Sequence, residues 1–306
     1  MGKKFVTAGL FLVTCTASLP LHAAVEGAFQ LTRLDEESWS ANYCYATPVD
    51  AIRFERPFKG LRENSWSVED KAFVLTFTDD TAELRRTDGG DFRCATVMLE
   101  TYTVMPEKDY YAFSPFSDGG VSVYTGHLMG PVLVDGEWQE TVLDARYTAR
   151  MDENVVTREP ERLVHQFVYF GKQPMLATEG VVAVIDPAVP GKARAGILAS
   201  IPAVTAMLEQ DFDFVPRSPY TVFMAMQLDA SDGYSIKGGV QPDQILFTLK
   251  GGGVASLVEK NPAQLPKLTA HEVLHLWQVE HWFDLLGNDH PWVHEGSADA
   301  LAIELM

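Results

Sequence analysis

The stretch His271-Glu272-Val273-Leu274-His275 lies near the end of this 306-residue chain, and the organisation of its last third follows from it. Residues four apart lie on one face of an α-helix, so His271 and His275 can direct two imidazole groups at one metal ion. Glu272 is one position further round, where its carboxylate can reach a water molecule at that metal without binding the metal itself. The stretch therefore predicts a helix with two metal ligands and a general base.

A third ligand is predicted after a gap of nineteen residues, in the segment Trp292-Val293-His294-Glu295-Gly296. Catalytic zinc usually has three protein ligands and one open position, and Glu295 is the expected third, on a second helix that residues 287–291 turn back against the first. Asp299 follows Glu295 at helical spacing, where it can accept the free ring N–H of a ligand histidine and fix the tautomer of that histidine. One Zn²⁺ per chain is the predicted cofactor.

Simpler interpretations of these residues are open at this point. Thr269 and Glu272 also fit a capping box, in which Glu272 would only satisfy backbone N–H groups at the start of a helix. His275 lies in an apolar stretch and could be an ordinary core histidine. Neither interpretation explains why Glu295 and Asp299 follow at helical spacing, so the metal site is the stronger prediction.

Together these motifs resemble the gluzincin metallopeptidases, the clan of thermolysin and of aminopeptidases with a Trp-x-x-Glu-Gly segment. The two histidines with Glu295 and Asp299 are similar to the thermolysin pattern, and Trp292-Val293-His294-Glu295-Gly296 is similar to the aminopeptidase-like branch. The resemblance covers roughly residues 195–306. It implies a thermolysin-like catalytic domain in this part of the chain. Together with the β-type runs upstream, which predict an N-terminal all-β sandwich or saddle, it indicates an α+β protein.

The same resemblance implies an edge strand that ends in a glycine-rich, substrate-binding segment upstream of the zinc helix. Residues 245–250, followed by Gly251, Gly252 and Gly253, occupy that place, so these glycines are candidate contacts to the substrate backbone. A glycine run can equally mark an ordinary turn. Aminopeptidases of this branch hold the amino terminus of the substrate with a Glu in this segment, whereas here Val254 follows the glycines. Aminopeptidase specificity is therefore not implied.

The predicted function is that of a secreted zinc metallopeptidase acting on a peptide or protein substrate. Zinc would polarise the scissile carbonyl and lower the pKa of its bound water to about 7, and Glu272 would move the proton to the leaving amine. One alternative is a degenerate or structural-zinc protein of the same fold that acts as a binding or scaffold module. Another is a metal-free exported adhesin or inhibitor built on the β-rich region.

The ends of the sequence carry two further expectations. Residues 1–23 combine a basic start, an apolar run and the close Leu21-His22-Ala23, as in a secretory signal peptide, so the protein is expected to be periplasmic or extracellular. No later segment approaches about twenty uninterrupted apolar residues, so stable membrane insertion is not expected. The last residues before Met306 continue a helical pattern without a stop signal, so the catalytic domain is expected to be truncated, with only its upper half present.

The net charge argues against one class of partner, and the cysteine content predicts a disulfide. The chain has 24 basic and 42 acidic residues, a net charge of −18, which repels phosphate backbones and argues against nucleic acid as a partner. Without the leader, two cysteines remain. Cys44 and Cys94 would form one disulfide in an oxidising compartment, or would remain as two buried thiols.

Two regions of different periodicity follow the leader. Residues 24–190 contain short β-type runs separated by turns and predict the all-β domain. Asp135-Gly136 between two apolar runs predicts a hairpin. Residues 191–306, the expected catalytic domain, change to mixed helical and strand patterns. The elements expected there are a helix at 193–210, strands at 220–228 and 244–250, and the zinc helix at 266–283.

Overall fold

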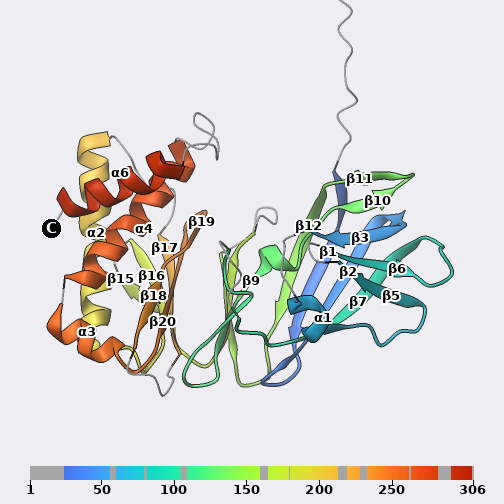
Figure 1. Ribbon diagram of the computed structural model, residues 1–306, viewed down its shortest axis with the longest axis horizontal. Helices are drawn as coiled ribbons and strands as arrows, with labels where there is room; N and C mark the ends of the chain where they lie inside the picture. Colours follow the sequence, from blue (N-terminus) through green and yellow to red (C-terminus); the bar gives the residue numbers. More distant parts are fainter. Residues whose placement is uncertain are drawn as a thin grey trace, which may run out of the picture.

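The computed structural model describes residues 24–55, 60–78, 81–104, 109–158, 165–178, 180–212, 219–227, 233–261, 263–281 and 291–304. The predicted signal peptide and most of the turn predicted at 287–291 lie outside these residues. The described chain is a mixed α and β protein that is rich in sheet (Figure 1). One lobe is built of strands, and helices cover a sheet in the other. Every described helix is too short or too polar to cross a lipid bilayer.

Two five-stranded sheets form the first lobe. Their strands are β1 (Val25–Arg33), β2 (Ser38–Val49), β3 (Ala51–Phe54), β4 (Trp66–Ser67), β5 (Phe73–Phe77), β6 (Ala82–Arg86), β7 (Phe92–Glu100), β10 (Val132–Val134), β11 (Glu137–Gln139) and β12 (Thr141–Thr148), with the short helix α1 (Leu61–Ser65) between β3 and β4. One sheet has the order β12-β1-β2-β7-β4, and the other β11-β10-β3-β6-β5. Side chains of both sheets share one core, so the predicted β-rich first region is confirmed.

Strand β2 shows why this region folds as a sandwich. Trp39, Ala41, Tyr43 and Tyr45 are buried, whereas the residues between them are partly exposed. This period of two gives the strand one face for the core and one for solvent. The predicted hairpin is also confirmed, because β10 and β11 are joined by Asp135 and Gly136, with φ values of 52° and 80°. A two-residue hairpin turn of type I′ needs positive φ at both positions, which glycine adopts without strain.

The two cysteines are joined in a disulfide. Cys44 on β2 lies directly opposite Cys94 on β7 in the antiparallel pairing, with their Cα atoms 4.1 Å apart. The bond links two neighbouring strands of the first sheet covalently. The alternative of two separate buried thiols is therefore wrong.

Removing this disulfide is expected to lower the free energy of unfolding by about 2–4 kcal/mol, because the bond closes a long loop and so restricts the unfolded chain. The two cysteines are 50 residues apart in sequence. Urea unfolding of the oxidised chain and of the Cys44→Ser/Cys94→Ser double variant measures the difference. The reduced wild-type chain is the matched control and should unfold like the double variant. A double variant as stable as the oxidised chain would contradict a stabilising role.

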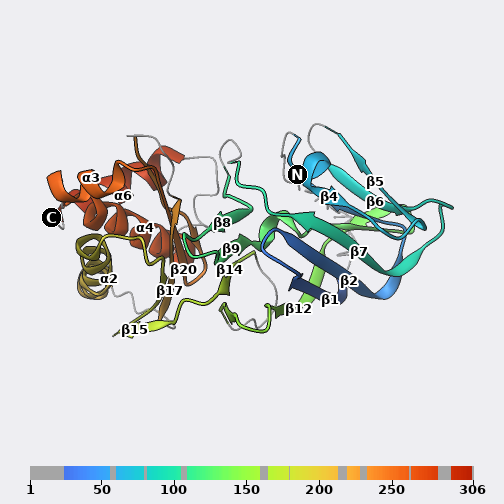
Figure 2. The ribbon, with the colours of Figure 1, turned by 90° about the horizontal axis from the view of Figure 1, so that it is seen from below.

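A four-stranded sheet lies between the lobes (Figure 1 and Figure 2). It contains β8 (Phe113–Pro115), β9 (Val121–Tyr124), β13 (Asn154–Val156) and β14 (Phe167–Gly171), in the order β13-β14-β9-β8, and the short 3₁₀ helix η1 (Thr125–His127) follows β9. Strand β14 is buried on both faces. Val168 and Phe170 pack into the core of the first lobe, and Phe167 and Tyr169 pack towards the second lobe. The middle sheet thus joins the two lobes through apolar contact.

The second lobe contains the six-stranded sheet that carries the site. Its strands are β15 (Leu176–Thr178), β16 (Val181–Ile185), β17 (Tyr220–Gln227), β18 (Ser235–Lys237), β19 (Val240–Gln241) and β20 (Gln244–Lys250), and its helices are α2 (Gly191–Phe212), α3 (Val254–Lys260), α4 (Gln264–His281) and α6 (Pro291–Glu304). The order is β15-β16-β17-β20-β18, with β19 also paired to β20. The helices lie on the face away from the middle sheet (Figure 1).

All four elements expected in the second region are present as α2, β17, β20 and α4. Two features differ from expectation. Strands β15 and β16 precede residue 190 but belong to this sheet, because β16 pairs with β17 in parallel, so the sheet crosses the predicted domain boundary. The prediction that residues 245–250 form an edge strand is wrong, because β20 has β17 on one side and β18 and β19 on the other.

Polar contacts also join the middle sheet to the second lobe. The buried carboxylate of Asp186, at the end of β16, accepts hydrogen bonds from the backbone N–H of Ser117 at 2.6 Å and from its hydroxyl at 2.5 Å. The hydroxyl of Tyr110, on the segment before β8, donates to the carbonyl of Val240 in β19 at 2.8 Å. The segments that flank β8 are therefore held against β19 and the end of β16.

Candidate metal centre

Helix α4 positions the two histidines. Its apolar residues, including Leu265, Val273 and Leu274, are buried in the core of the second lobe, which fixes the rotation of the helix. His271 and His275 lie one turn apart on the edge of this apolar face, with side chains 14 % and 15 % exposed. The edge faces α6, and α4 and α6 pack against each other. The helical spacing predicted from the sequence is therefore present, on a helix whose orientation is set by packing.

Three ligand atoms converge between α4 and α6. Nε2 of His271 lies 2.9 Å from Nε2 of His275, and Oε2 of Glu295 lies 3.3 Å and 3.5 Å from these two nitrogens. Ligands about 2.0–2.1 Å from a tetrahedral zinc ion lie roughly 3.3 Å apart, so these three atoms fit one such ion. Within the described ranges, this is the one group of three or more metal-ligating side chains.

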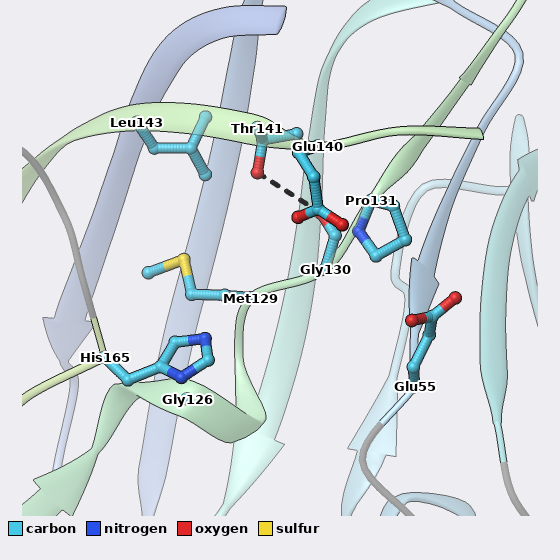
Figure 3. Close-up of a pocket in the computed structure, with 9 residues that line it drawn as sticks. All are labelled: Glu55, Gly126, Met129, Gly130, Pro131, Glu140, Thr141, Leu143 and His165. Atoms are coloured by element: carbon cyan, nitrogen blue, oxygen red, sulfur yellow. Dashed lines mark hydrogen bonds between the residues drawn. The ribbon is translucent and has the colours of Figure 1, made fainter. Parts of the chain in front are cut away.

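A pocket in the first lobe provides a comparison (Figure 3). It has a volume of about 270 Å³, and its lining includes Glu55, Glu140 and His165. These groups are of the same chemical type as those between α4 and α6. However, they do not form a convergent group of ligands among the described residues. We therefore place the candidate metal centre between α4 and α6.

Each histidine has a polar neighbour at its other ring nitrogen. Oδ1 of Asp299, on α6, lies 3.3 Å from Nδ1 of His271, where the sequence analysis expected a carboxylate. Oε1 of Gln278, on α4, lies 2.7 Å from Nδ1 of His275. Sequence reasoning missed Gln278, although it follows His275 by three residues and so lies one helical turn away. Burial lowers the pKa of His275, which favours the neutral imidazole that binds metals.

Glu272 is buried beside the two histidines, with only 6 % of the residue exposed. Its carboxylate packs against Gly238, between β18 and β19, where a Cβ atom would overlap Oε1 of Glu272. Burial raises the pKa of Glu272 to about 8, and the negative charge of Glu295 adds to this effect. The capping-box interpretation is wrong, because α4 begins at Gln264 and the Thr269 hydroxyl donates to the carbonyl of Leu265 at 2.9 Å within the helix.

This burial predicts a pH-dependent stability of the metal-free chain. The pKa of Glu272 in the folded state is about 8, against an ordinary value of 4.5. The protonated group therefore contributes to the free energy of unfolding fully below pH 4.5, and this contribution is lost as the pH rises to 8. The Glu272→Gln variant lacks this loss. Its stability relative to wild type should therefore increase by on the order of 4 kcal/mol between pH 5 and pH 8. Urea unfolding in chelator at both pH values measures this difference, and an unchanged difference would contradict the raised pKa.

The predicted substrate glycines serve a different local purpose. Gly251, Gly252 and Gly253 form the turn between β20 and α3, and Gly251 has a φ of 96°. The backbone N–H of Gly251 donates to the carbonyl oxygen of Gln227 at 2.9 Å, and that of Gly253 donates to the carbonyl oxygen of Gly233 at 3.0 Å. A turn is thus the role that the structure shows for these residues.

A different pair of glycines reaches the candidate site. Gly238 contacts Glu272, and Gly239 packs against the ring of Tyr110, on the segment before β8. Burial raises the pKa of Tyr110, and the nearby charge of Glu272 contributes to the increase. The consecutive glycines were visible in the sequence, but only the fold shows that they lie beside Glu272.

Comparison with protein-family models and with curated proteins gives no match. Among solved structures, a yeast LTA4 hydrolase in complex with bestatin matches with a TM-score of 0.48 at 12 % identity, covering 92 % of this chain and 48 % of that one. An M1 zinc metallopeptidase from Deinococcus radiodurans matches with a TM-score of 0.34 at 11 % identity, covering 83 % and 63 %. The chain therefore spans less than two thirds of the length of each of these enzymes.

Proposed function

We propose that the protein is a zinc-dependent metallopeptidase that hydrolyses peptide bonds. The observation that carries this proposal is the convergence of three ligand atoms beside a buried glutamate. His271, His275 and Glu295 supply two imidazoles and one carboxylate, a ligand set used by catalytic zinc sites in which one position stays open. Glu272 is adjacent to the first ligand in sequence and buried at the site, which is where a general base is needed.

The chain's own residues would divide the chemistry between them. Zinc, when bound, supplies Lewis acidity that polarises a carbonyl group and makes water a stronger acid. His271, His275 and Glu295 would hold the ion, and Asp299 would orient the ring of His271. The positive charge of a bound ion would lower the pKa of Glu272 from its raised value in the metal-free chain, so that its carboxylate would accept a proton from the attacking water and deliver it to the leaving amine.

The segment around Gly238 and Gly239 suits an extended peptide. These residues carry no side chains, so Glu272 and the ring of Tyr110 pack directly against them, and a peptide lying along this segment would be within reach of Glu272. Tyr110 reaches the segment from just before β8 and donates a hydrogen bond to Val240. We assign the substrate backbone to this segment rather than to the turn at Gly251.

We further propose that the protein acts outside the cytoplasm. The leader pattern of residues 1–23 supports export, and the Cys44–Cys94 disulfide is compatible with an oxidising compartment. The periplasm and the extracellular space both meet this condition. Mass spectrometry of the chain recovered from each cell fraction would show whether the leader is removed and where the product collects.

A mixed peptide library tests the proposed activity. The zinc-loaded chain, a chelator-treated sample and the treated sample after addition of zinc are incubated with the library, and new peptide termini are identified by mass spectrometry. We expect cleavage by the loaded chain, its loss with chelator and its return with zinc. Release of single residues would indicate an exopeptidase, and internal cuts an endopeptidase. Zinc binding without any cleavage would contradict the proposed activity and favour a binding or scaffold module with a structural zinc ion.

A further inference from the structure

Gln278 connects the two helices that carry the candidate zinc ligands. It lies on α4 and is 2 % exposed. Its carbonyl oxygen, Oε1, is 2.7 Å from Nδ1 of His275 on the same helix. Its amide nitrogen, Nε2, donates to the carbonyl of His294 at 2.9 Å and to the hydroxyl of Ser297 at 2.8 Å, both on α6. All three contacts are at least partly buried.

These contacts allow the amide only one orientation. The Ser297 hydroxyl donates its own proton to the carbonyl of Val293 at 2.5 Å, so towards Gln278 it acts as an acceptor. The side of Gln278 that faces α6 therefore meets two acceptors and must present its NH₂ group. A flipped amide would place carbonyl against carbonyl at His294 in a buried position, which costs free energy.

The orientation of Gln278 determines the tautomer of His275. With an acceptor oxygen at Nδ1, the imidazole carries its proton there and donates it to Gln278. A neutral imidazole has one ring proton, so Nε2 keeps a free lone pair. That lone pair lies towards Nε2 of His271 and Oε2 of Glu295, at 2.9 Å and 3.5 Å. His275 is thus held in the form that binds a metal ion.

The same amide also places α6. His294, whose carbonyl it contacts, immediately precedes Glu295 in the chain. Ser297, its other partner, follows Glu295 by about half a helical turn. The corresponding neighbour of His271, Asp299, has a side chain that is 61 % exposed, so its interaction is weakened by water. Gln278 is the buried member of the pair and joins one ligand helix to the other.

We propose that Gln278 is a positioning residue that assembles the centre in the absence of metal, by holding His275 in its Nδ1–H tautomer and by fixing the Glu295 segment of α6 against α4. The consequence for zinc affinity rests on the proposed function, whereas the tautomer of His275 does not. The two parts are therefore tested separately. The variants are Gln278→Met, which keeps length but removes both polar atoms, and the matched control Gln264→Met at an exposed position of the same helix.

Nitrogen-15 NMR of the histidine rings in the zinc-free chain tests the tautomer, at a pH where His275 is neutral and with its signals assigned from a His275→Asn variant. Wild type and Gln264→Met should show the proton on Nδ1, and Gln278→Met should show a mixture of both tautomers. A proton on Nε2 in wild type, or the same tautomer in all three chains, would overturn the proposal.

Gln278→Glu provides a second test that does not depend on the stability of Gln278→Met. Its carboxylate still accepts the Nδ1 proton of His275 but cannot donate to His294 or Ser297. We expect the wild-type tautomer in this variant. A shift of the proton to Nε2 would contradict the role of the acceptor oxygen.

Zinc affinity, measured by competition with a chromophoric chelator, tests the consequence for the metal. Loss of a partner of a ligand histidine typically weakens metal binding by 10- to 100-fold, which is the decrease expected for Gln278→Met. Gln264→Met should bind like wild type. Equal affinity in all three chains would overturn the positioning role. A wild-type chain that binds no zinc would contradict the proposed function instead, while the NMR experiment would still decide the tautomer.

Discussion

Replacing Glu272 with glutamine is expected to lower peptide turnover by about 10²–10⁴-fold while one zinc ion per chain stays bound. Glutamine preserves the shape of the side chain and its packing against Gly238, but an amide cannot take a proton from water at neutral pH. The three ligand atoms belong to other residues, so the metal site itself remains. The measurements are kcat/KM at saturating zinc and metal content by mass spectrometry.

Glu259→Gln is the matched control, because Glu259 is an exposed glutamate on the neighbouring helix α3. It should leave both turnover and zinc unchanged. Full activity in the Glu272→Gln variant would show that another group is the base. Loss of zinc together with activity would show that Glu272 is needed for the metal site itself, which the proposed division of roles excludes.

Replacing Glu295 with alanine is expected to weaken zinc binding by more than about 100-fold, since even partners outside the ligand set contribute 10- to 100-fold. Two imidazoles on one helical turn would remain, and turnover should fall to background. Glu295 lies on α6, and its Oε2 is 3.3 Å from Nε2 of His271 and 3.5 Å from Nε2 of His275. Competition with a chromophoric chelator measures the affinity.

Glu304→Ala controls for the removal of a glutamate from the same helix, because Glu304 is exposed near the end of α6. It should bind zinc with wild-type affinity. An unchanged affinity in Glu295→Ala would mean that a different residue supplies the third ligand. The two glutamate variants together separate binding of the metal, lost with Glu295, from proton transfer, lost with Glu272.

Local periodicity accounts for what the sequence predicted well. The spacing of His271 and His275 is one helical turn, and the hydrophobic patterns of α2, β17 and β20 are continuous over seven or more residues. Such signals depend only on neighbours in the chain. The approach of Glu295 was also anticipated, because the turn expected at residues 287–291 would fold a second helix back against the first.

The features that sequence reasoning missed depend on distant contacts. The edge strand at residues 245–250 was implied by the resemblance alone, and strands β18 and β19, which cover β20, have three and two residues, too few for a period to be read. Strand β16 pairs in parallel with β17 across the 22-residue helix α2, which no local pattern reveals. Tyr110, beside the middle sheet, reaches Gly239 from more than a hundred residues earlier in the chain. The role of Gln278 depends on which face of α4 meets α6, a property of the packed structure.

Anomalous diffraction at the zinc absorption edge, from a crystal of the full chain grown with zinc, tests the central claim most directly. We predict one anomalous peak between α4 and α6, about 2.0–2.2 Å from Nε2 of His271, from Nε2 of His275 and from a carboxylate oxygen of Glu295. No peak at this place in a crystal that contains zinc, or a peak coordinated by other residues, would contradict the assignment of the metal centre and, with it, the proposed peptidase.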